Sequence, residues 1–190
     1  MFTTIVITRP TFSCDEAEQA ARLLRHGNVG LLHIRKPHSS EEETEELVRQ
    51  LAKEWHDRLV LHDHFHLAQR YALHGVHLNS RNPQPPEGWH GSVSRSCHSL
   101  EEVKAFKEKC DYVSLSPIFD SVSKQGYHSA FSRDVIAEAV ADGIIDCKVY
   151  ALGGVRFSML DTVKEMGFGG AMILGDAWNT CGHTVVSYQL

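Results

Sequence analysis

Hydrophobic and polar positions along the 190-residue chain repeat with two different periods. Short apolar or β-branched runs predict strands, and longer stretches with apolar residues three or four positions apart predict helices. The strand runs lie at residues 3–8, 30–35, 59–63, 75–78, 90–96, 111–119, 147–154 and 170–175. Helical patterns cover residues 15–26, 39–56, 67–73, 133–141 and 158–166, with a further helix that begins at Leu100.

The boundaries of several helices carry recognisable signals. Acidic residues fill the first turn after Ser39 and Ser40, where they interact favourably with the helix dipole. Ser99, followed three positions later by Glu102, predicts a capping box, so that this helix begins just after His98. The stretch "NSRNPQPPEG" (79–88) is rich in turn residues and predicts a loop in place of a helix.

Strict alternation of strands and helices predicts a parallel sheet, because each crossover must return the chain to the same edge. Eight such units predict an α/β fold, a (β/α)8 TIM barrel that forms one domain over residues 1–190. The barrel is lean, and the tail "DAWNTCGHTVVSYQL" predicts an abbreviated last helix. A doubly wound open sheet is the alternative, but "ITRPTFS" after the first strand is not the glycine-rich phosphate loop that such a fold needs.

The composition and net charge of the chain indicate which classes of binding partner to expect. The chain is 42% hydrophobic and 23% charged, as in soluble globular proteins, and its net charge of −5 argues against nucleic acid or an anionic membrane as the main partner. A small anionic substrate remains compatible with this charge. No apolar run approaches the ~18 residues of a membrane span, and "MFTTIVITRPTF" lacks the pattern of a signal peptide. Five cysteines without CxxC spacing predict reduced thiols in a cytoplasmic protein.

In a barrel of this type, functional residues lie where strands end and loops begin. Polar or glycine residues at predicted strand ends are Arg35, Asp63, 79–82, 96–98, 121–124, 153–154 and 175–176. Gly153 and Gly154 in "ALGGV" and Gly175 in "ILGDA" follow the seventh and eighth strands, where barrel enzymes often bind phosphate through backbone N–H groups. Tight turns without a ligand are the alternative explanation for these glycines.

Two further positions could bind an anion. Ser121, Ser123 and Lys124 offer two hydroxyls and an ammonium on one loop, a combination that can wrap a polyanion, although a solvated loop is the alternative. Arg35 in "HIRKP" could hold a phosphate or carboxylate with its planar guanidinium. A structural ion pair would explain the same arginine.

Thirteen histidines are the unusual feature of the composition. In "LHDHFHLA", His62 and His64, or His64 and His66, could bind zinc in a metal-dependent hydrolase, with His77 and His98 as further ligands. Alternate strand residues face opposite sides, however, so His62 and Asp63 cannot both point inward. The chain also lacks an HExxH motif, and we expect most of its histidines to be surface residues or hydrogen-bonded core residues.

Between Thr4 and Trp178 the motifs "HIR", "HD", "GVHL", "SxHSLEE", "DYVSLSPIF-SxSK", "ALGGV" and "GFGGAMILG" occur in this order. In order and spacing they resemble the thiamine phosphate synthase/TenI superfamily. The resemblance implies a (β/α)8 barrel, a role in thiamin biosynthesis and a small-molecule thiazole phosphate as ligand. It also implies that Gly153, Gly154 and the turn of Leu174 and Gly175 hold the phosphate.

One branch of this superfamily, the synthases, uses Mg²⁺ to join a pyrimidine methyl diphosphate to the thiazole phosphate. The resemblance assigns Arg35 and the arm of Ser121, Ser123 and Lys124 to substrate binding, and Asp63 to the metal. The chain departs from the synthase pattern at three positions: His33 replaces a glutamine, Pro37 a lysine, and Asn82 the second metal-binding carboxylate. A neutral amide cannot supply the charge of a carboxylate ligand to a hard cation, so the expected Mg²⁺ site is weakened.

The other branch, the TenI-type thiazole tautomerases, needs no metal and has a motif close to "RSCHSLEE". The resemblance implies that His98 moves a proton on a carboxythiazole phosphate with help from Ser96, and that Arg35 and His33 contact the substrate. This metal-free tautomerase is our preferred expectation, with the Mg²⁺-dependent synthase and a non-catalytic thiazole phosphate binder as alternatives. We expect a homo-oligomer, because the short tail after Trp178 leaves barrel surface uncovered, and neither nucleic acid nor membrane as partner.

Overall fold

The computed structural model describes residues 1–26, 28–119 and 131–178 of the chain. The strands are β1 (Thr3–Ile7), β2 (Leu31–Ile34), β3 (Leu59–Leu61), β4 (Gly75–Leu78), β5 (Ser92–Cys97), β6 (Tyr112–Leu115), β7 (Val149–Ala151) and β8 (Gly170–Ile173). The α-helices are α1 (Glu16–His26), α2 (Glu41–Trp55), α3 (Phe65–Arg70), α4 (Leu100–Phe106), α5 (Arg133–Ala141) and α6 (Leu160–Glu165). Short 3₁₀ turns η1 (His56–Arg58), η2 (Lys107–Lys109), η3 (Phe157–Met159) and η4 (Asp176–Trp178) complete the described elements.

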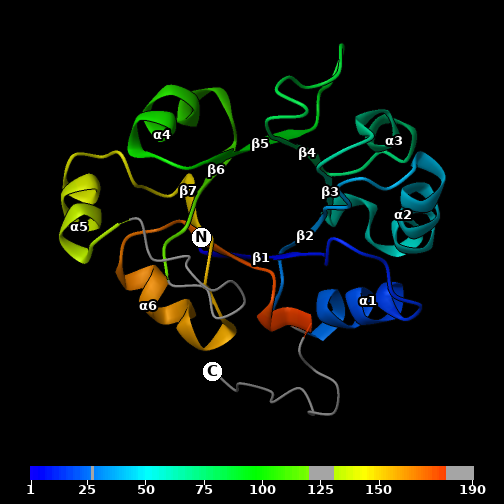
Figure 1. Ribbon diagram of the computed structural model, residues 1–190, viewed down its shortest axis with the longest axis horizontal. Helices are drawn as coiled ribbons and strands as arrows, with labels where there is room; N and C mark the ends of the chain where they lie inside the picture. The colour runs from blue at the N-terminus through cyan, green and yellow to red at the C-terminus, as the bar shows by residue number, and fades with distance from the viewer. Residues whose placement is uncertain (27, 120–130, 179–190) are drawn as a thin grey trace.

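The eight strands form a closed parallel barrel in sequence order, with β1 paired to both β2 and β8. The helices form an outer ring around it (Figure 1). Closure confirms the predicted (β/α)8 fold and rules out the open doubly wound sheet, because no strand between β1 and β8 is left at an edge. Between β4 and β5 the chain runs as turns, as "NSRNPQPPEG" predicts. No helix among the described residues is long and apolar enough to cross a membrane.

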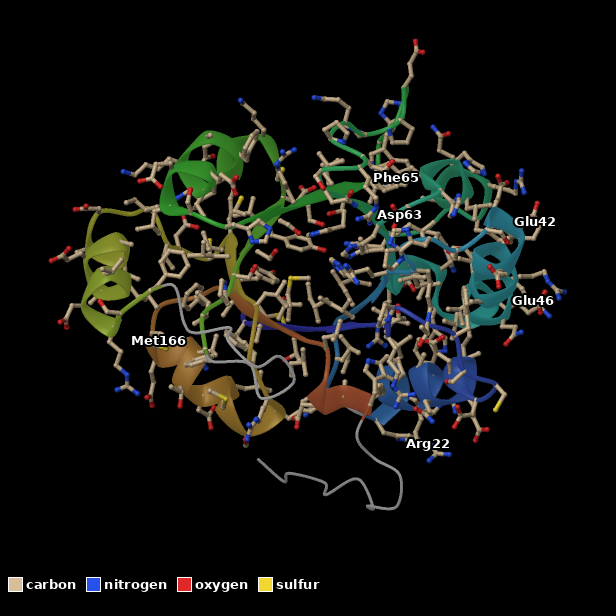
Figure 2. All side chains as sticks on the ribbon, viewed as in Figure 1. Arg22, Glu42, Glu46, Asp63, Phe65 and Met166 are labelled. Carbon is tan, nitrogen blue, oxygen red and sulfur yellow. The ribbon has the colours of Figure 1, made fainter. Side chains whose placement is uncertain are left out.

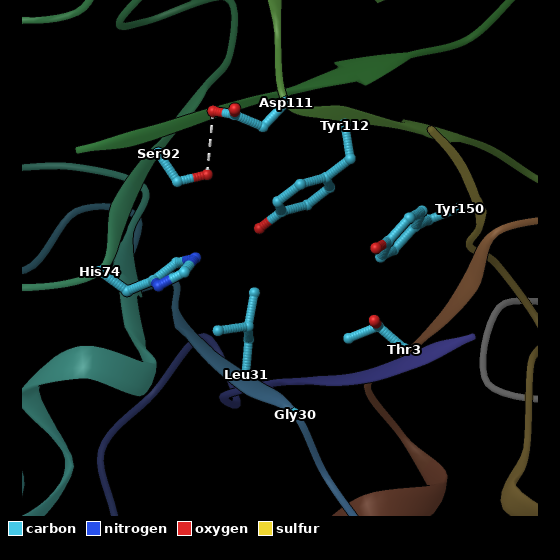
Figure 3. Close-up of a pocket in the computed structure, with 8 residues that line it drawn as sticks. All are labelled: Thr3, Gly30, Leu31, His74, Ser92, Asp111, Tyr112 and Tyr150. Atoms are coloured by element: carbon cyan, nitrogen blue, oxygen red, sulfur yellow. Dashed lines mark hydrogen bonds between the residues drawn. The ribbon is translucent and has the colours of Figure 1, made fainter. Parts of the chain in front are cut away.

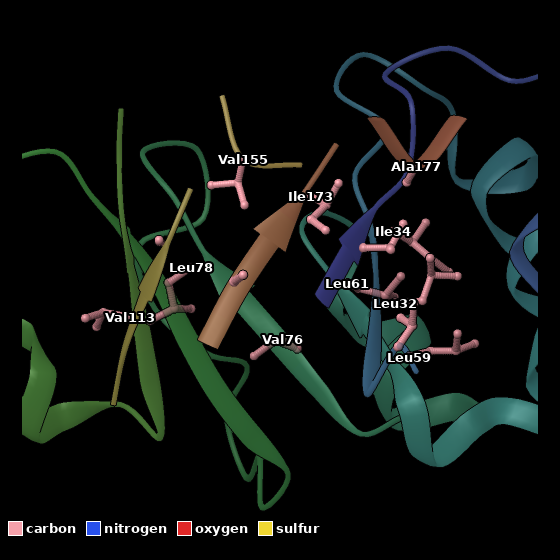
Figure 4. Packing of buried hydrophobic residues seen from close by; sticks show 14 of the residues in the cluster. Leu32, Ile34, Leu59, Leu61, Val76, Leu78, Val113, Val155, Ile173 and Ala177 are labelled. Atoms are coloured by element: carbon pink, nitrogen blue, oxygen red, sulfur yellow. The ribbon is translucent and has the colours of Figure 1, made fainter. Parts of the chain in front are cut away.

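The main hydrophobic core lies between the outer surface of the barrel and the helices. Alternate strand residues such as Leu32, Ile34, Leu59 and Leu61 point outward into this layer and are buried (Figure 4). Because side chains alternate across a strand, the residues between them point into the barrel. The inward positions therefore decide what the barrel can bind.

The interior of the barrel divides into an apolar and a polar half. Ile5, Ile7, Met172 and the stacked pair Tyr112 and Tyr150 form the apolar half. The polar half, on β2 to β6, holds buried hydroxyl and imidazole side chains: His33, His62, His77, Ser94 and Ser114. A polar interior on one side places hydrogen-bonding groups directly below the carboxyl ends of these strands.

Several elements are shorter than the sequence pattern predicts. The run 111–119 predicts one long strand, but β6 ends at Leu115 because Pro117 has no N–H to continue the ladder. Likewise, the predicted strands 59–63 and 147–154 shrink to the three residues of β3 and β7. The helix predicted at 67–73 is α3 (Phe65–Arg70), which stops before Ala72, whose φ is +49°. A left-handed residue ends a right-handed helix.

The cap before α4 differs from the predicted capping box in one bond. Ser99 Oγ accepts from the backbone N–H of Glu102, at 3.2 Å, as predicted. The Glu102 carboxylate, however, accepts from the backbone N–H of His98, at 2.6 Å. The complete reciprocal box occurs instead at Ser40 and Glu43 of α2. The glutamate thus fixes the backbone of the histidine that precedes the helix.

Candidate active site

Asp63 follows β3 at the carboxyl end of the barrel, with its side chain largely covered. Figure 2 shows it toward the middle of the molecule, whereas Glu42 and Glu46 point outward from α2. Arg81 donates to both carboxylate oxygens of Asp63, from Nε to Oδ1 at 3.1 Å and from Nη2 to Oδ2 at 3.0 Å. Asn82 Nδ2 donates to the same Oδ1 at 2.8 Å. Each oxygen of the carboxylate therefore accepts at least one hydrogen bond from a protein donor.

This arrangement does not fit a Mg²⁺ site. A hard cation needs free oxygen ligands, and here a guanidinium cation already binds both oxygens of Asp63. Asn82 directs its amide nitrogen toward Asp63 and the carbonyl of His62, so it acts as a donor rather than as a ligand. The expected weakening of the metal site at Asn82 is thus accompanied by a second change at Arg81, which no sequence motif indicated.

Arg35 lies just beyond β2 and is half-buried. Its backbone is held on both sides by Thr8 Oγ1, which accepts from Arg35 N–H at 2.9 Å and donates to its carbonyl at 3.3 Å. The guanidinium makes no hydrogen bond or close ion pair with any residue that the structure describes. Burial lowers the pKa of Arg35, Arg81 lowers it further, and Asp63 opposes both effects. A partly buried guanidinium without a protein partner can bind an anionic group.

The neighbouring Lys36 stabilises the fold and does not point into the proposed substrate site. Its ammonium group is buried and contacts both carboxylate oxygens of Glu16 at 2.6 Å. It also donates to the carbonyls of Arg9 and Thr11. Burial lowers the pKa of Lys36 and raises that of Glu16. Of the two basic residues in "HIRKP", only Arg35 is available to a substrate.

His98 is exposed at the end of β5. Its Nδ1 lies 3.1 Å from Ser116 Oγ and 3.4 Å from the carbonyl of Ser116, which follows β6. The Glu102 carboxylate fixes the backbone below it. No described residue hydrogen-bonds to Nε2 of His98. The ring is thus oriented through one nitrogen and leaves the other for a substrate, which is the arrangement required of an acid/base histidine.

Ser96 does not contact His98 directly. Its hydroxyl lies 2.8 Å from Nε2 of His77, whose Nδ1 lies 2.8 Å from Ser94 Oγ. We expected the hydroxyl of Ser96 to assist His98. In the structure it is instead within hydrogen-bond distance of His77 on the adjacent strand β4. Ser116, which no sequence motif singled out, is the hydroxyl partner of His98.

His33 is fully buried inside the barrel rather than placed at its rim. Its Nδ1 lies 2.9 Å from His62 Nε2, and its Nε2 lies 2.7 Å from Tyr112 Oη. With both ring nitrogens engaged, His33 has none left for a substrate in this arrangement. The direct substrate contact expected of His33 is therefore replaced by contacts within the barrel.

His33, His62 and His77 form one buried cluster whose candidate ligand atoms all lie within 4.8 Å of one another. Burial lowers the pKa of each imidazole, for His77 to about 3. The zinc alternative expected His62 with His64, or His64 with His66, and the structure brings neither pair together as ligands. His64 reaches the carbonyl of Ser39 and His66 pairs with Glu41 on the outer side. His77 was named as a further ligand, and only the barrel places His33 beside it.

The glycine turns after β7 and β8 lie next to each other. Gly153 and Gly154 have φ of +90° and +69°, and a side chain at Gly153 would meet Pro117 Cα at 2.8 Å. Neither N–H of this pair donates to a described residue. Asp176, just after Gly175, accepts from the backbone N–H of Phe157 at 2.9 Å and thus ties the two turns together. Free N–H groups in a glycine turn are suited to a phosphate.

Two site predictions remain, the turn at Leu174 and the loop with Ser121, Ser123 and Lys124. Leu174 packs on the apolar half of the barrel interior beside Gly175, as the expected turn after β8 requires. Ser121, Ser123 and Lys124 lie outside the described residues. Their expected role in binding a polyanion stays a prediction, as does closure of their loop over a substrate.

Known proteins are similar to this chain in sequence and in fold. The family model described as thiamine monophosphate synthase matches residues 4–175. A thiamine-phosphate synthase of Thermus thermophilus is 28% identical over 170 residues, which cover 86% of this chain and 82% of that protein. One of Caldicellulosiruptor saccharolyticus is 26% identical, with 78% of this chain and 71% of the relative covered.

Solved structures agree with the family match. A thiamine phosphate pyrophosphorylase of Bacteroides thetaiotaomicron superposes with a TM-score of 0.84 at 39% identity, over 99% of this chain and 90% of that chain. A thiamine phosphate pyrophosphorylase of Pyrococcus furiosus superposes with a TM-score of 0.70 at 20% identity, over 91% of this chain and 85% of the other. The second likeness concerns the fold alone.

Proposed function

The chain belongs to the thiamine monophosphate synthase family, which makes it an enzyme of thiamin biosynthesis, and from that premise we propose that it is a metal-free thiazole phosphate tautomerase. The observation that carries this proposal is the ion pair of Asp63 with Arg81. It occupies the carboxylate on which a synthase-type Mg²⁺ site would depend. A proton transfer needs no such site. The proposal includes a carboxythiazole phosphate as substrate, a cytoplasmic location and a homo-oligomeric state.

In this mechanism the phosphate binds to the turn at Gly175 and to the N–H groups of Gly153 and Gly154, which donate to no residue that the structure describes. Arg35, whose guanidinium has no partner among the described residues, binds the carboxylate of the thiazole. His98 uses Nε2 to take a proton from one carbon of the substrate and returns it to another, while Ser116 holds Nδ1. General acid/base catalysis of this kind contributes typically about 10²- to 10⁴-fold in rate.

The synthase reaction is the second candidate, and the names of the relatives favour it over the tautomerase. The proteins compared above are called thiamine-phosphate synthase or thiamine phosphate pyrophosphorylase, one of them at 39% identity. In that candidate Mg²⁺ would assist departure of pyrophosphate. Asp63 would have to release Arg81 before it could bind the ion, because the guanidinium occupies both carboxylate oxygens.

Two parallel assays separate the candidates. One follows aromatisation of carboxythiazole phosphate by purified enzyme in the presence of a chelator. The other follows formation of thiamine phosphate from the pyrimidine diphosphate and the thiazole phosphate with Mg²⁺. We expect turnover in the first assay, and a fall of about 10²- to 10⁴-fold in kcat/KM for His98→Ala. His66→Ala, an exposed histidine paired with Glu41 on the outer side, is the matched control and should keep full activity.

Activity only in the second assay would replace the proposal with the synthase. Binding of thiazole phosphate by calorimetry with both assays blank would identify a non-catalytic binder. Unchanged tautomerase turnover in His98→Ala would remove His98 from the mechanism while keeping the reaction.

A further inference from the structure

Three imidazoles meet inside the barrel, below the rim where the proposed substrate site lies. His33, His62 and His77 are 0%, 4% and 1% exposed. Nδ1 of His33 and Nε2 of His62 are 2.9 Å apart, and the rings of His62 and His77 are stacked with centroids 4.2 Å apart. Three buried imidazoles in mutual contact are an unusual way to fill a barrel, where branched aliphatic side chains normally dominate.

Strand register brings the three residues to one side. His33 on β2 is level with Val60 on β3, and Val60 is level with Gly75 on β4. His62 and His77, each two positions further along, therefore sit at the same height on adjacent strands. His77 is in turn level with Ser94 on β5. Because residues two apart share a face, all of these side chains point into the barrel.

We propose that His33, His62 and His77 form a binding site for one divalent transition-metal ion of the Zn²⁺ type. Their candidate ligand atoms lie within 4.8 Å of one another. A tetrahedral Zn²⁺ with Zn–N bonds of about 2.0 Å needs nitrogens about 3.3 Å apart. Nδ1 of His33 and Nε2 of His62 are 2.9 Å apart, close to this spacing. Imidazole nitrogen favours Zn²⁺, Co²⁺, Ni²⁺ and Cu²⁺, whereas Mg²⁺ and Ca²⁺ favour oxygen.

Hydroxyl groups lie within hydrogen-bond distance of two of the three rings, His33 and His77, and orient them. Tyr112 Oη lies 2.7 Å from Nε2 of His33, on the opposite edge from the nitrogen that faces His62. His77 has a hydroxyl at each nitrogen, Ser94 and Ser96, so one serine can hold the ring while the other nitrogen binds the ion. Metal-binding histidines almost always have such a partner on the second nitrogen. Burial keeps the three imidazoles neutral near pH 7 by lowering each pKa, and the neutral form is the one that binds a metal.

A neighbouring hydroxyl supplies an independent observation. Ser114 Oγ is fully buried and has no hydrogen-bond partner among the residues that the structure describes. Ser114 pairs in register with Ser96 and lies two positions from Tyr112, so it shares the inner face of the barrel with the cluster. Buried hydroxyls are rarely left without a partner. Three protein ligands leave a fourth position for water on the ion, and a bound water would supply that partner.

The amino-terminal mouth of the barrel is hollowed beside a residue that contacts the cluster. A pocket of about 480 Å³ opens there, lined by residues at strand starts that include Leu31, Ser92, Tyr112 and Tyr150 (Figure 3). Tyr112, which lines this pocket, also contacts His33 through its hydroxyl. Tyr112 therefore connects the wall of this pocket to the buried cluster. The three histidines are not among the residues of the proposed substrate site, so the metal site is tested independently of the tautomerase proposal.

Titration of untagged protein, stripped with a chelator, with Co²⁺ and Zn²⁺ tests the inference. We expect one ion per chain by calorimetry, a visible Co²⁺ spectrum of low-coordinate nitrogen type and no competition by Mg²⁺. His33→Gln and His77→Gln should each weaken binding at least about 10-fold, and Tyr112→Phe about 10- to 100-fold. His66→Gln is the exposed control and should bind as the wild type does. His98→Ala should also bind normally, which separates this site from the proposed catalytic site.

Three results would overturn the inference: no binding of either ion, equal binding in all variants, or loss of binding in Asp63→Asn but not in His77→Gln. Circular dichroism identifies any variant that fails to fold. If both histidine variants fail, the wild-type protein loaded with Cu²⁺ decides the question by electron paramagnetic resonance. Nitrogen hyperfine structure would support the site, and a spectrum of oxygen ligands alone would overturn it.

Discussion

Arg81 donates two hydrogen bonds to the carboxylate of Asp63, at 3.1 and 3.0 Å. The guanidinium therefore occupies the carboxylate that an enzyme acting on a diphosphate would use to bind a metal ion. Asn82 completes the arrangement with a third donor to the same carboxylate. The two residues are consecutive in the loop after β4, so one short loop converts an acidic group from a potential metal ligand into the acceptor of an ion pair. The ion pair distinguishes the two candidate reactions, because the synthase reaction needs a metal ion at Asp63 and the tautomerase reaction does not.

The first prediction concerns this loop. In Arg81→Ala/Asn82→Asp the carboxylate of Asp63 loses its cation and gains a second carboxylate, so the pair becomes able to bind Mg²⁺. We expect calorimetry to show Mg²⁺ affinity at least about 10-fold higher than in the wild-type enzyme, because oxygen charge is the main determinant of such sites. Arg49→Ala, which removes an exposed ion pair with Glu46, is the control. Equal Mg²⁺ affinity in the double variant and the wild type would contradict the argument.

The second prediction concerns Ser116 as a positioning residue for His98. Ser116→Ala removes the hydroxyl 3.1 Å from His98 Nδ1, and the loss of one neutral hydrogen bond corresponds to about 1 kcal/mol, or roughly fivefold in kcat/KM. The loss should appear in kcat rather than in KM, because Ser116 orients the ring of His98 and is not proposed to bind the substrate. Ser116→Thr keeps a hydroxyl and should restore most of kcat. A fall in stability with an unchanged kcat would show that Ser116 is only structural.

A third prediction follows from the close approach of Gly153 to Pro117. Alanine at Gly153 would have to adopt φ of +90° with its Cβ 2.8 Å from Pro117 Cα. We expect Gly153→Ala to lower the free energy of unfolding by about 2–3 kcal/mol and to weaken phosphate binding. Gly143 also has a positive φ, +68°, but a side chain there meets no atom within 4 Å, so Gly143→Ala should cost only about 1 kcal/mol. Urea denaturation and phosphate calorimetry measure both effects, and equal losses in the two variants would refute the role of Pro117.

The fourth prediction concerns the buried ion pair of Lys36 with Glu16. Removing one partner leaves an uncompensated buried charge, so Lys36→Met should lower the free energy of unfolding by about 3–5 kcal/mol at pH 7. Burial already raises the pKa of Glu16 above its ordinary value, and loss of Lys36 raises it further. As the pH falls through this raised folded-state pKa, Glu16 takes up a proton and the penalty disappears.

The difference in free energy of unfolding between the wild type and Lys36→Met should therefore become smaller as the pH falls from 7 to 5. Urea denaturation at each pH measures it. Glu16→Leu/Lys36→Met, which removes both charges, should recover much of the stability and lose this pH dependence. A deficit that stays constant over this range would show that the lost contacts of Lys36 with the carbonyls of Arg9 and Thr11 dominate instead.

Several features followed from local sequence because their causes are local. Alternation of apolar runs and helical patterns predicted the order of the strands, and Ser99 predicted the start of α4. The position of His98 at a strand end followed from the same pattern. Strand ends were less predictable: β6 stops before Pro117, although the apolar run continues to Phe119. Apolar content extends beyond a strand wherever the loop also packs on the core.

Side-chain partnerships could not be predicted in the same way. Asp63 and Arg81 are 18 positions apart, His33 and Tyr112 are 79 apart, and Ser116 and His98 follow different strands. Each partnership depends on which strands are adjacent and on how far each is shifted along its neighbour. The alternation rule said only that His62 and Asp63 cannot both point inward, and closure of the barrel brought His33 and His77 to His62.

The sequence by itself determined the eight-unit barrel, the family and the positions at strand ends where chemistry can occur, because these depend on periodicity and on short motifs within single segments. Only the tertiary structure decided that Arg81 neutralises Asp63, that Ser96 serves His77 rather than His98, and that three histidines share one buried site. The physical reason is register. In a closed parallel barrel, the shift between neighbouring strands fixes which inward side chains meet, and no single strand carries that information.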